Sequence, residues 1–199
     1  MNFRGKKVLI TGGLGFIGSN LARKLAALEA DVTVLDCHLA GHGANEFNVE
    51  GISTKRRDLD VREPAAAREA GQADFVFHVA GQTSHLDSMT SPKPDLEINA
   101  GGTLNLLEGM KDGKRKEERS GSPVFLFVGT RAQYGKVPGG VATEDSPFFP
   151  VDAYGASKAA AESYVLLYGR AHGIPVVSVR LTNTYGPRMR VVDARQTFL

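Results

Sequence analysis

Two residues of the sequence, Tyr154 and Lys158, form a pair that can exchange a proton with an alcohol or a carbonyl. They are four positions apart in a segment that predicts a helix, so both side chains project from one face. A tyrosine is a poor base at neutral pH, but a nearby ammonium group favours the phenolate and lowers the pKa of the phenol. The pair therefore predicts a general acid/base. The spacing alone is equally compatible with a surface lysine beside a half-buried tyrosine.

Thr130 and Asn99 are the further candidates for a catalytic site. Thr130 follows the expected strand Val124–Val128 and Gly129, at a carboxyl end of the sheet, where open α/β folds bind their ligands. We expect its hydroxyl group to hydrogen-bond the reacting oxygen and to share a proton with Tyr154. Asn99, in the helix before that strand, is expected to hold a water molecule in a proton relay, or else to be a polar surface residue.

A glycine-rich turn near the amino terminus predicts a dinucleotide site. The segment Gly12-Gly13-Leu14-Gly15-Phe16-Ile17-Gly18 follows one expected strand and opens a helix, although its spacing departs from the commoner Gly-x-Gly-x-x-Gly pattern. A sharp turn here lets the backbone approach a pyrophosphate, whose charge the helix N-terminus favours. The alternative is a glycine turn with no ligand. The predicted cofactor-binding residues of this segment are Gly12, Gly15, Phe16, Ile17 and Gly18.

Two acidic residues at strand ends are candidates for the adenosine half of a cofactor. Asp36 ends the second expected strand, where a carboxylate can accept hydrogen bonds from ribose hydroxyl groups. It favours NAD over NADP, because a 2′-phosphate would meet a like charge and no arginine adjoins Asp36. Asp58 and Leu59 close the third strand and are expected to flank the adenine, although Asp58 is equally well explained as a strand-end turn residue.

Alternating strands and helices must position these candidates. Short β-branched or aromatic runs alternate with longer helical segments, which predicts a Rossmann-type, doubly wound, mostly parallel sheet with helices on both faces. Helices are expected along the apolar stripe from Ile17 to Leu28, over residues 95–110, and over residues 152–172 with Asp152 as N-cap. The expected strands are Lys7–Thr11, Asp31–Asp36, Ser53–Arg57, Phe75–Val79, Val124–Val128 and Val176–Arg180.

The composition is that of one ordinary globular domain. Of the 199 residues, 42% are hydrophobic, and the net charge of +2 is too small to argue for nucleic acid or an anionic membrane as partner. Cys37 is the only cysteine, so an internal disulfide is excluded and a cytoplasmic location is expected. No signal peptide or membrane span is predicted. No metal site is predicted either, because no ligand spacing links the histidines, which are His38, His42, His78, His85 and His172.

Taken together, these motifs resemble the extended short-chain dehydrogenase/reductase superfamily, in its NAD-dependent sugar epimerase/dehydratase branch. The resemblance covers essentially the whole chain, and the motifs are specific in combination and in their order. They are Thr11-Gly12-Gly13-Leu14-Gly15-Phe16-Ile17-Gly18, Asp36, Asp58-Leu59, His78-Val79-Ala80-Gly81, Asn99 with Gly102-Thr103, Thr130 with Tyr134-Gly135, Tyr154-Gly155-Ala156-Ser157-Lys158, and Arg180-Leu181-Thr182-Asn183-Thr184-Tyr185-Gly186-Pro187-Arg188.

The resemblance implies NAD as cofactor and a nucleotide sugar as substrate. It implies that Tyr154 removes a proton from a sugar hydroxyl while the hydride of the same carbon passes to NAD. In epimerases the resulting ketone turns over, and the hydride returns to its other face. It further implies that Lys158 holds the nicotinamide ribose and that Asn183 lies near the sugar nucleotide. The segment implied to lie along the cofactor is Val79, Ala80 and Gly81.

Two departures from the family pattern bear on the reaction and on the domains. Dehydratases of this branch carry an acidic pair directly after the catalytic threonine, whereas this chain has Arg131 and Ala132 there, so epimerisation is favoured. Family members also continue into a smaller substrate domain. We therefore expect residues 1–188 to form the NAD-binding domain and residues 189–199 to begin a truncated substrate-binding segment.

The predicted function is thus that of an NAD-dependent nucleotide-sugar epimerase. Two alternatives stay open: an NAD-dependent alcohol dehydrogenase or carbonyl reductase of the same superfamily, and a truncated NAD-binding module without turnover. The family often dimerises through the helices that correspond to residues 95–110 and 152–172, so a homodimer is expected.

Overall fold

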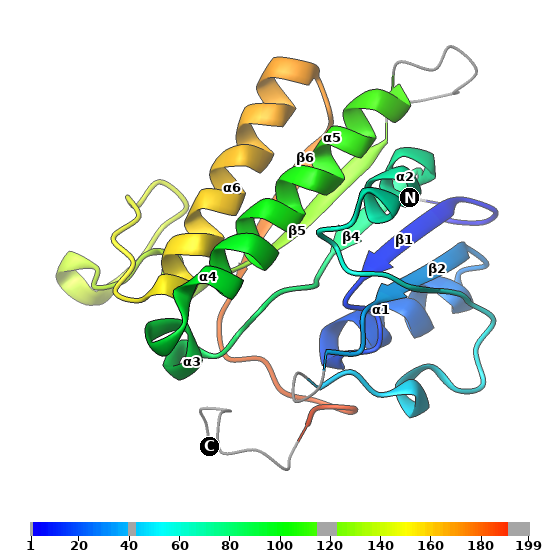
Figure 1. Ribbon diagram of the computed structural model, residues 1–199, viewed down its shortest axis with the longest axis horizontal. Coiled ribbons are helices and arrows are strands. Elements are labelled where there is room, and N and C mark those ends of the chain that lie inside the picture. The colour runs from blue at the N-terminus through cyan, green and yellow to red at the C-terminus, as the bar shows by residue number, and fades with distance from the viewer. Residues whose placement is uncertain (1, 40–42, 115–122, 191–199) are drawn as a thin grey trace.

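The core of the molecule is a six-stranded parallel sheet with the strand order β3-β2-β1-β4-β5-β6 (Figure 1). The computed structural model describes residues 2–39, 43–114 and 123–190. This strand order is that of the doubly wound dinucleotide-binding folds, and it confirms the predicted Rossmann-type sheet. The strands are β1 (Lys7–Thr11), β2 (Asp31–Asp36), β3 (Lys55–Asp58), β4 (Phe75–His78), β5 (Val124–Thr130) and β6 (Val176–Leu181).

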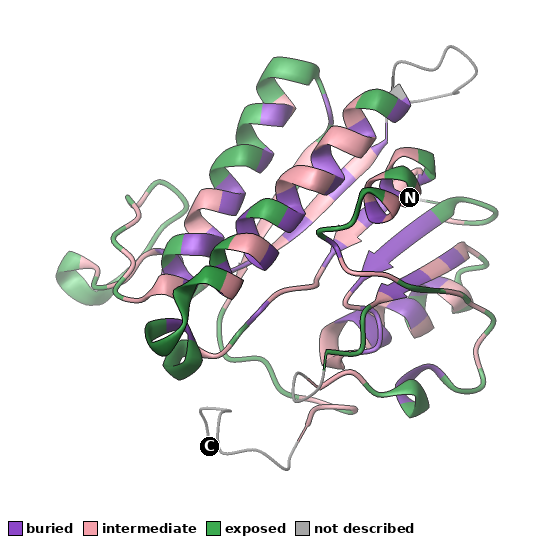
Figure 2. Cartoon of the chain, viewed as in Figure 1, coloured by how far each residue is buried: buried purple, intermediate pink, exposed green. Residues whose placement is uncertain are grey.

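Helices pack on both faces of this sheet and bury two separate apolar clusters. On one face, Ala22 and Leu25 of α1 pack against β1 and β2. On the other face, α2, α5 and α6 cover a larger cluster that includes Phe125 and Phe127 of β5 (Figures 1 and 2). No helix among the described residues is long and apolar enough to span a membrane. The helices are α1 (Phe16–Ala27), α2 (Pro64–Gln72), α3 (His85–Thr90), α4 (Pro92–Asp95), α5 (Gly102–Lys114) and α6 (Ala153–His172).

The expected elements are found, with small differences at their ends. The third strand begins at Lys55 rather than Ser53, because only Lys55–Asp58 pairs with β2. The apolar stripe of the first helix ends earlier than expected, since α1 ends at Ala27 and Leu28 is exposed. Asp152 caps α6 as predicted, because its Oδ1 accepts a hydrogen bond from the Gly155 amide at 2.6 Å.

The helix expected over residues 95–110 is interrupted by a π turn. α4, the π turn Leu96–Gly101 and α5 follow one another without a break. A π turn inserts one residue into the helical repeat and is frequent at functional sites. Here it contains Asn99, which is fully buried.

The sheet is less completely covered over β5 than over β1. Along β5, Phe125 and Phe127 are buried under α5 and α6, whereas Leu126 and Val128 on the opposite face are half-buried. Residues 191–199, which make up most of the expected substrate-binding segment, lie outside the described part of the chain.

Candidate active site

The glycine turn between β1 and α1 brings three backbone segments into direct contact. Gly12 has a φ of +66°, and a Cβ built on it would lie 2.7 Å from the Ala80 amide nitrogen. A Cβ on Gly18 would lie 2.2 Å from the Gly12 carbonyl oxygen. Only glycine fits at these two positions without a shift of the backbone. The turn therefore packs α1 tightly against β1 and against the chain after β4.

The N-terminus of α1 is open to a ligand. Gly15 is the N-cap residue, and no side chain caps the first amide groups of the helix. Such amide groups, together with the helix dipole, form a site for a phosphate group. Because Gly15 and Phe16 both line the adjoining cavity, the geometry fits the pyrophosphate of a dinucleotide.

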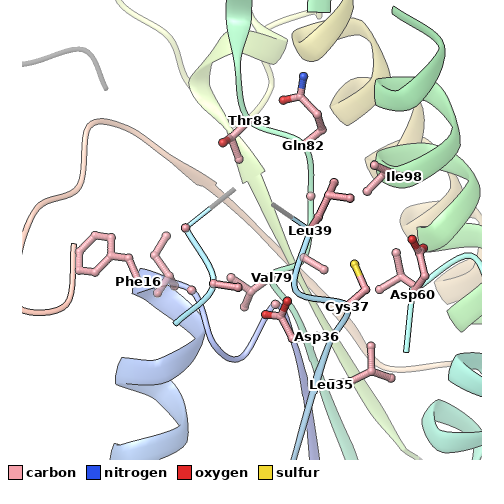
Figure 3. A pocket seen from close by; sticks show the side chains of 18 of the residues that line it. Phe16, Leu35, Asp36, Cys37, Leu39, Asp60, Val79, Gln82, Thr83 and Ile98 are labelled. Carbon is pink, nitrogen blue, oxygen red and sulfur yellow. The ribbon is translucent and has the colours of Figure 1, made fainter. Parts of the chain in front are cut away.

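A cavity of about 320 Å³ runs along the carboxyl ends of the strands next to this turn (Figure 3). Its volume is in the range of small-molecule sites. Most of the predicted cofactor residues line it, whereas Gly18 is buried beneath the turn. The lining residues are Gly12, Gly15, Phe16, Ile17, Leu35, Asp36, Cys37, Leu39, Gly43, Ala44, Leu59, Asp60, Val61, Val79, Ala80, Gly81, Gln82, Thr83, Ser84, Ile98 and Arg190.

Asp36 lies in this lining with its carboxylate fixed by the backbone. One oxygen accepts a hydrogen bond from the Leu14 amide at 3.1 Å, and the other accepts one from the His38 amide at 3.2 Å. Each carboxylate oxygen can accept more than one hydrogen bond. Asp36 thus keeps acceptor capacity toward the cavity, as the recognition of a ribose requires.

Asp58 does not line the cavity, in contrast to our expectation. Its side chain is 77% exposed and contacts Arg56 at 3.4 Å. Asp60, two residues further on, lines the cavity instead, and a hydrogen bond from Arg62 lowers the pKa of its carboxyl group. The Cys37 thiol lies beside Asp60 (Figure 3), and burial together with the nearby carboxylates raises its pKa. Leu59 lies in the lining as predicted.

A buried hydrogen-bond chain centred on His78 connects the cofactor turn with the helix that carries Asn99. Thr103 donates its hydroxyl hydrogen to the Asn99 carbonyl at 2.5 Å, so its oxygen accepts the hydrogen bond from His78 Nε2 at 2.9 Å. His78 Nδ1 then accepts from the Thr11 hydroxyl at 2.7 Å. The Thr11 oxygen in turn accepts from the amide groups of the two residues after His78. His78 is therefore neutral, and burial, with the charge of Lys158, lowers its pKa to about 3.

Thr130, Tyr154 and Lys158 come together beside one end of the cavity. Thr130 is placed to donate a hydrogen bond to the Tyr154 oxygen, which acts to lower the pKa of the phenol. Lys158 is 4% exposed, and its Nζ lies 4.4 Å from the centre of the Phe127 ring. None of the three lines the cavity itself. A Cβ built on the lining residue Gly81 would, however, lie 3.6 Å from Lys158 Nζ, so only a glycine separates the two sites.

Burial is the main cause of the pKa shifts of Tyr154 and Lys158. It raises the pKa of Tyr154, although the hydrogen bond from Thr130 acts in the opposite direction. Burial also lowers the pKa of Lys158 to about 7, although the charge of Glu162 opposes this shift. The expectation that the ammonium of Lys158 would lower the pKa of Tyr154 is thus not met, because burial raises this pKa and the carboxylates of Asp152 and Asp95 raise it further.

Asn99 is in place, but its side chain is already engaged. Oδ1 accepts a hydrogen bond from the Gln82 amide at 3.0 Å, and Nδ2 donates to the Gln82 carbonyl at 3.1 Å and to Ser157 Oγ at 2.9 Å. Both N–H groups are therefore used within the protein, which differs from the water-holding role we expected. The side chain instead connects the segment after β4 with α6.

The sequence reasoning missed a group of polar residues around Tyr154. The His85 ring contacts the Tyr154 ring edge-on at 4.9 Å, and His85 Nδ1 lies 2.6 Å from Asp152 Oδ2. Asp95 is fully buried, accepts a hydrogen bond from Gln82, and has a pKa raised to about 6 by burial and by Asp152. No spacing in the sequence reveals this group, because its members meet only when α3 and α4 pack against α6.

Two further predictions concern residues outside this cluster. Asn183 lies exposed in the loop after β6 and does not line the cavity, so its role toward a sugar nucleotide stays a prediction. In the described ranges 2–39, 43–114 and 123–190, no cluster of three histidine, cysteine or acidic side chains could hold a metal ion.

The strand order and the cavity are those of a dinucleotide-binding α/β domain, since the uncapped N-terminus of α1 opens onto the cavity at the strand ends. The chain belongs to the NAD-dependent epimerase/dehydratase family, whose model matches residues 8–197. This match confirms the predicted family, and with it NAD as the cofactor of the family.

The names of the similar proteins describe more than one reaction. A probable dTDP-glucose 4,6-dehydratase from Sinorhizobium fredii is 35% identical over 190 residues, covering 91% of this chain and 54% of the relative. A putative UDP-glucose 4-epimerase from Methanocaldococcus jannaschii is 36% identical over 183 residues, covering 91% and 57%. A crystal structure of Thermus thermophilus UDP-glucose 4-epimerase with NAD has a TM-score of 0.80 at 36% identity, covering 94% and 58%. The chain thus spans little more than half the length of these relatives.

Proposed function

We propose that this chain carries the cofactor and acid–base sites of an NAD-dependent nucleotide-sugar epimerase. The observation that carries the proposal is the contact between the two sites: the Lys158 ammonium lies directly behind Gly81, at the end of the cavity that the glycine turn opens. A sugar carbon at this end would meet both a hydride acceptor and a proton acceptor.

The residues present fit NAD. The glycine turn leaves room where a Cβ would collide with Ala80, and the uncapped amides of α1 suit a pyrophosphate. Asp36 suits the adenosine ribose and disfavours a 2′-phosphate. NAD supplies, when bound, a reversible acceptor for the hydride of a sugar carbon.

The acid–base steps fall to the side chains of the chain itself. Tyr154 takes the proton of a sugar hydroxyl and later returns it to the carbonyl oxygen of the keto sugar. When a sugar is bound, Thr130 donates its single hydroxyl hydrogen to the sugar oxygen instead of to Tyr154, and it holds that oxygen beside the phenol. Lys158, one helical turn after Tyr154 on α6, supplies in its ammonium form a positive charge that favours the phenolate.

The residues after Thr130 support epimerisation rather than dehydration. Removal of water needs an acid and a base at neighbouring carbons of the sugar, in addition to Tyr154. Arg131 and Ala132 follow Thr130 in a short 3₁₀ helix, and Arg131 is exposed. Neither residue can act as the carboxylic acid and carboxylate that such an elimination would require.

The proposal is tested by incubating the 199-residue chain with NAD and a panel of UDP-, GDP-, CDP- and dTDP-sugars. We expect a new stereoisomer from at least one sugar, with no net accumulation of NADH. Steady accumulation of NADH would instead indicate the dehydrogenase or reductase. Binding of NAD by this chain without conversion of any sugar would indicate an NAD-binding module, and no conversion by a full-length version would overturn the epimerase.

A homodimer in the cytoplasm also belongs to this proposal. α6 exposes Tyr164, Leu166 and Leu167 on its outer face, and such apolar side chains are frequent at helix–helix interfaces between subunits. Sedimentation of the purified chain should give twice the monomer mass, and a monomer at all concentrations would contradict the dimer.

A further inference from the structure

Glu162 is a buried carboxylate that the chemistry above does not use. It is 1% exposed and lies one helical turn after Lys158 on α6. Carboxylates are almost never buried without a partner. Glu162 has two partners, Gln133 in the short 3₁₀ helix after β5 and Arg180 in β6.

The contact with Gln133 leads directly to Thr130. Gln133 is fully buried and donates from Nε2 to a Glu162 oxygen at 2.5 Å. Its own Oε1 accepts a hydrogen bond from the backbone amide of Thr130 at 2.8 Å. This arrangement completes a capping box, because the Thr130 hydroxyl oxygen accepts from the Ala132 amide at 3.2 Å. The side chain of Gln133 thus fixes the backbone at the point where Thr130 turns toward Tyr154.

The contact with Arg180 fixes Glu162 itself. Arg180 donates from Nε and Nη2 to both oxygens of Glu162, at distances between 2.5 and 3.1 Å. Its guanidinium carbon lies 4.9 Å from the centre of the Tyr134 ring and 4.7 Å from the centre of the Phe148 ring, and Nη1 donates to the Tyr134 hydroxyl and to the Glu144 carbonyl. A guanidinium fixed on several sides in this way has little freedom to move. Glu162 is therefore held in one orientation, and it holds Gln133 in turn.

We propose that Glu162 is a positioning residue of the acid–base site, which fixes Thr130 through Gln133 and places a negative charge one turn from Lys158. The proposal rests on the assignment of Thr130, Tyr154 and Lys158 to that site. Its consequences can be measured in the protein without turnover, so that its failure is distinguishable from a failure of the proposed epimerase.

Glu162→Gln removes the charge and keeps the size of the side chain. Because the charge of Glu162 favours the ammonium form of Lys158, its loss should lower the pKa of Lys158 to below about 7. The measurement is a pH titration of isotope-labelled lysine side chains by NMR, with the Lys158 signal assigned by its absence in Lys158→Arg.

Gln133→Met removes the bond to Thr130 and leaves Glu162 paired with Arg180. If Gln133 positions Thr130, the hydrogen bond that lowers the pKa of Tyr154 is weakened, and that pKa should rise. The ultraviolet titration of tyrosine, taken as the difference from Tyr154→Phe, measures this. The pKa of Lys158 should stay unchanged in this variant, because the carboxylate next to it is retained.

Glu69→Gln is the control for both variants. It removes a carboxylate on α2 that pairs with Arg57 at 2.8 Å, and it should change neither titration. The proposal is overturned if folded Gln133→Met leaves the Tyr154 titration unchanged, which would make Glu162 a purely structural ion pair. Should Glu162→Gln fail to fold, Gln133→Met still decides, since it retains the ion pair with Arg180.

Discussion

The two halves of the site are built in different ways. The cofactor half, from β1 through α1 to β2, is shaped by backbone: a left-handed glycine, an uncapped helix end and a carboxylate fixed by two amides. The catalytic half, from β4 to α6, is shaped by buried side chains that bond across the fold, such as His78 to Thr11 over 67 positions. A site made of backbone tolerates changes of most side chains, whereas a site made of bonded side chains does not.

The largest effect is expected where the catalytic half touches the reacting atoms. Tyr154→Phe removes only the hydroxyl group and should lower turnover by roughly 10²- to 10⁴-fold, the usual contribution of a general acid/base. NAD affinity, which depends on the cofactor half, should stay nearly the same. Steady-state rates and calorimetry measure the two. Turnover within a few fold of the unmodified chain would show that another group is the base.

The His78 chain should make the catalytic half sensitive to acid. The pKa of His78 is about 3 in the folded chain and about 6.5 when unfolded, so its contribution to stability is fully present above pH 6.5 and is lost as pH falls toward 3. Between pH 7 and pH 5 the loss should be roughly 2 kcal/mol. Urea unfolding of the chain and of His78→Asn should show that this part of the pH dependence disappears in the variant. The control is His172→Asn, which replaces an exposed histidine. The prediction is contradicted if the free energy of unfolding depends on pH in the same way in His78→Asn and in His172→Asn.

In the cofactor half, one carboxylate should matter and its neighbour should not. Asp36→Ala removes the acceptor that faces the cavity and should weaken NAD binding by about 1.5 kcal/mol, or roughly tenfold. Asp58→Ala is the matched control, because Asp58 is exposed outside the cavity, and NAD affinity should not change. Equal losses in both variants would place the adenosine elsewhere.

The smallest effect is expected at Thr130. Thr130→Val keeps the shape of the side chain and removes its hydroxyl group, so one hydrogen bond worth about 1 kcal/mol is lost and turnover should fall about fivefold. The pKa of Tyr154 should rise at the same time, since the hydrogen bond from Thr130 lowers it. A fall in turnover without any change in the Tyr154 titration would separate Thr130 from Tyr154.

Local patterns explain why the cofactor half could be predicted. The strand, the glycine turn, the helix and Asp36 follow one another within a short stretch, and each has a signature of its own in the sequence. The choice between Asp58 and Asp60 could not be made in this way, because it depends on how the chain leaves β3 for the cavity. The charged residues around this strand end do not indicate which of the two carboxylates faces the cavity.

The catalytic half could be predicted only for residues with a fixed spacing. Tyr154 and Lys158 were found because one helical turn separates them, and Thr130 because it ends a strand. The engagement of Asn99 with Gln82 and Ser157 was missed, since it depends on a π turn that no pattern indicated. Nothing in the sequence distinguishes Gln133 and Glu162 from ordinary polar residues, because only the fold brings them into contact.

The proposed epimerase moves a hydride away from a sugar carbon and back to the same carbon, and turnover in D₂O shows whether this hydride exchanges with solvent. We expect NMR of the product to show a new stereoisomer without deuterium at the inverted carbon, because the hydride stays on the cofactor between the two transfers. Deuterium at that carbon, or a product that has lost water, would exclude this mechanism.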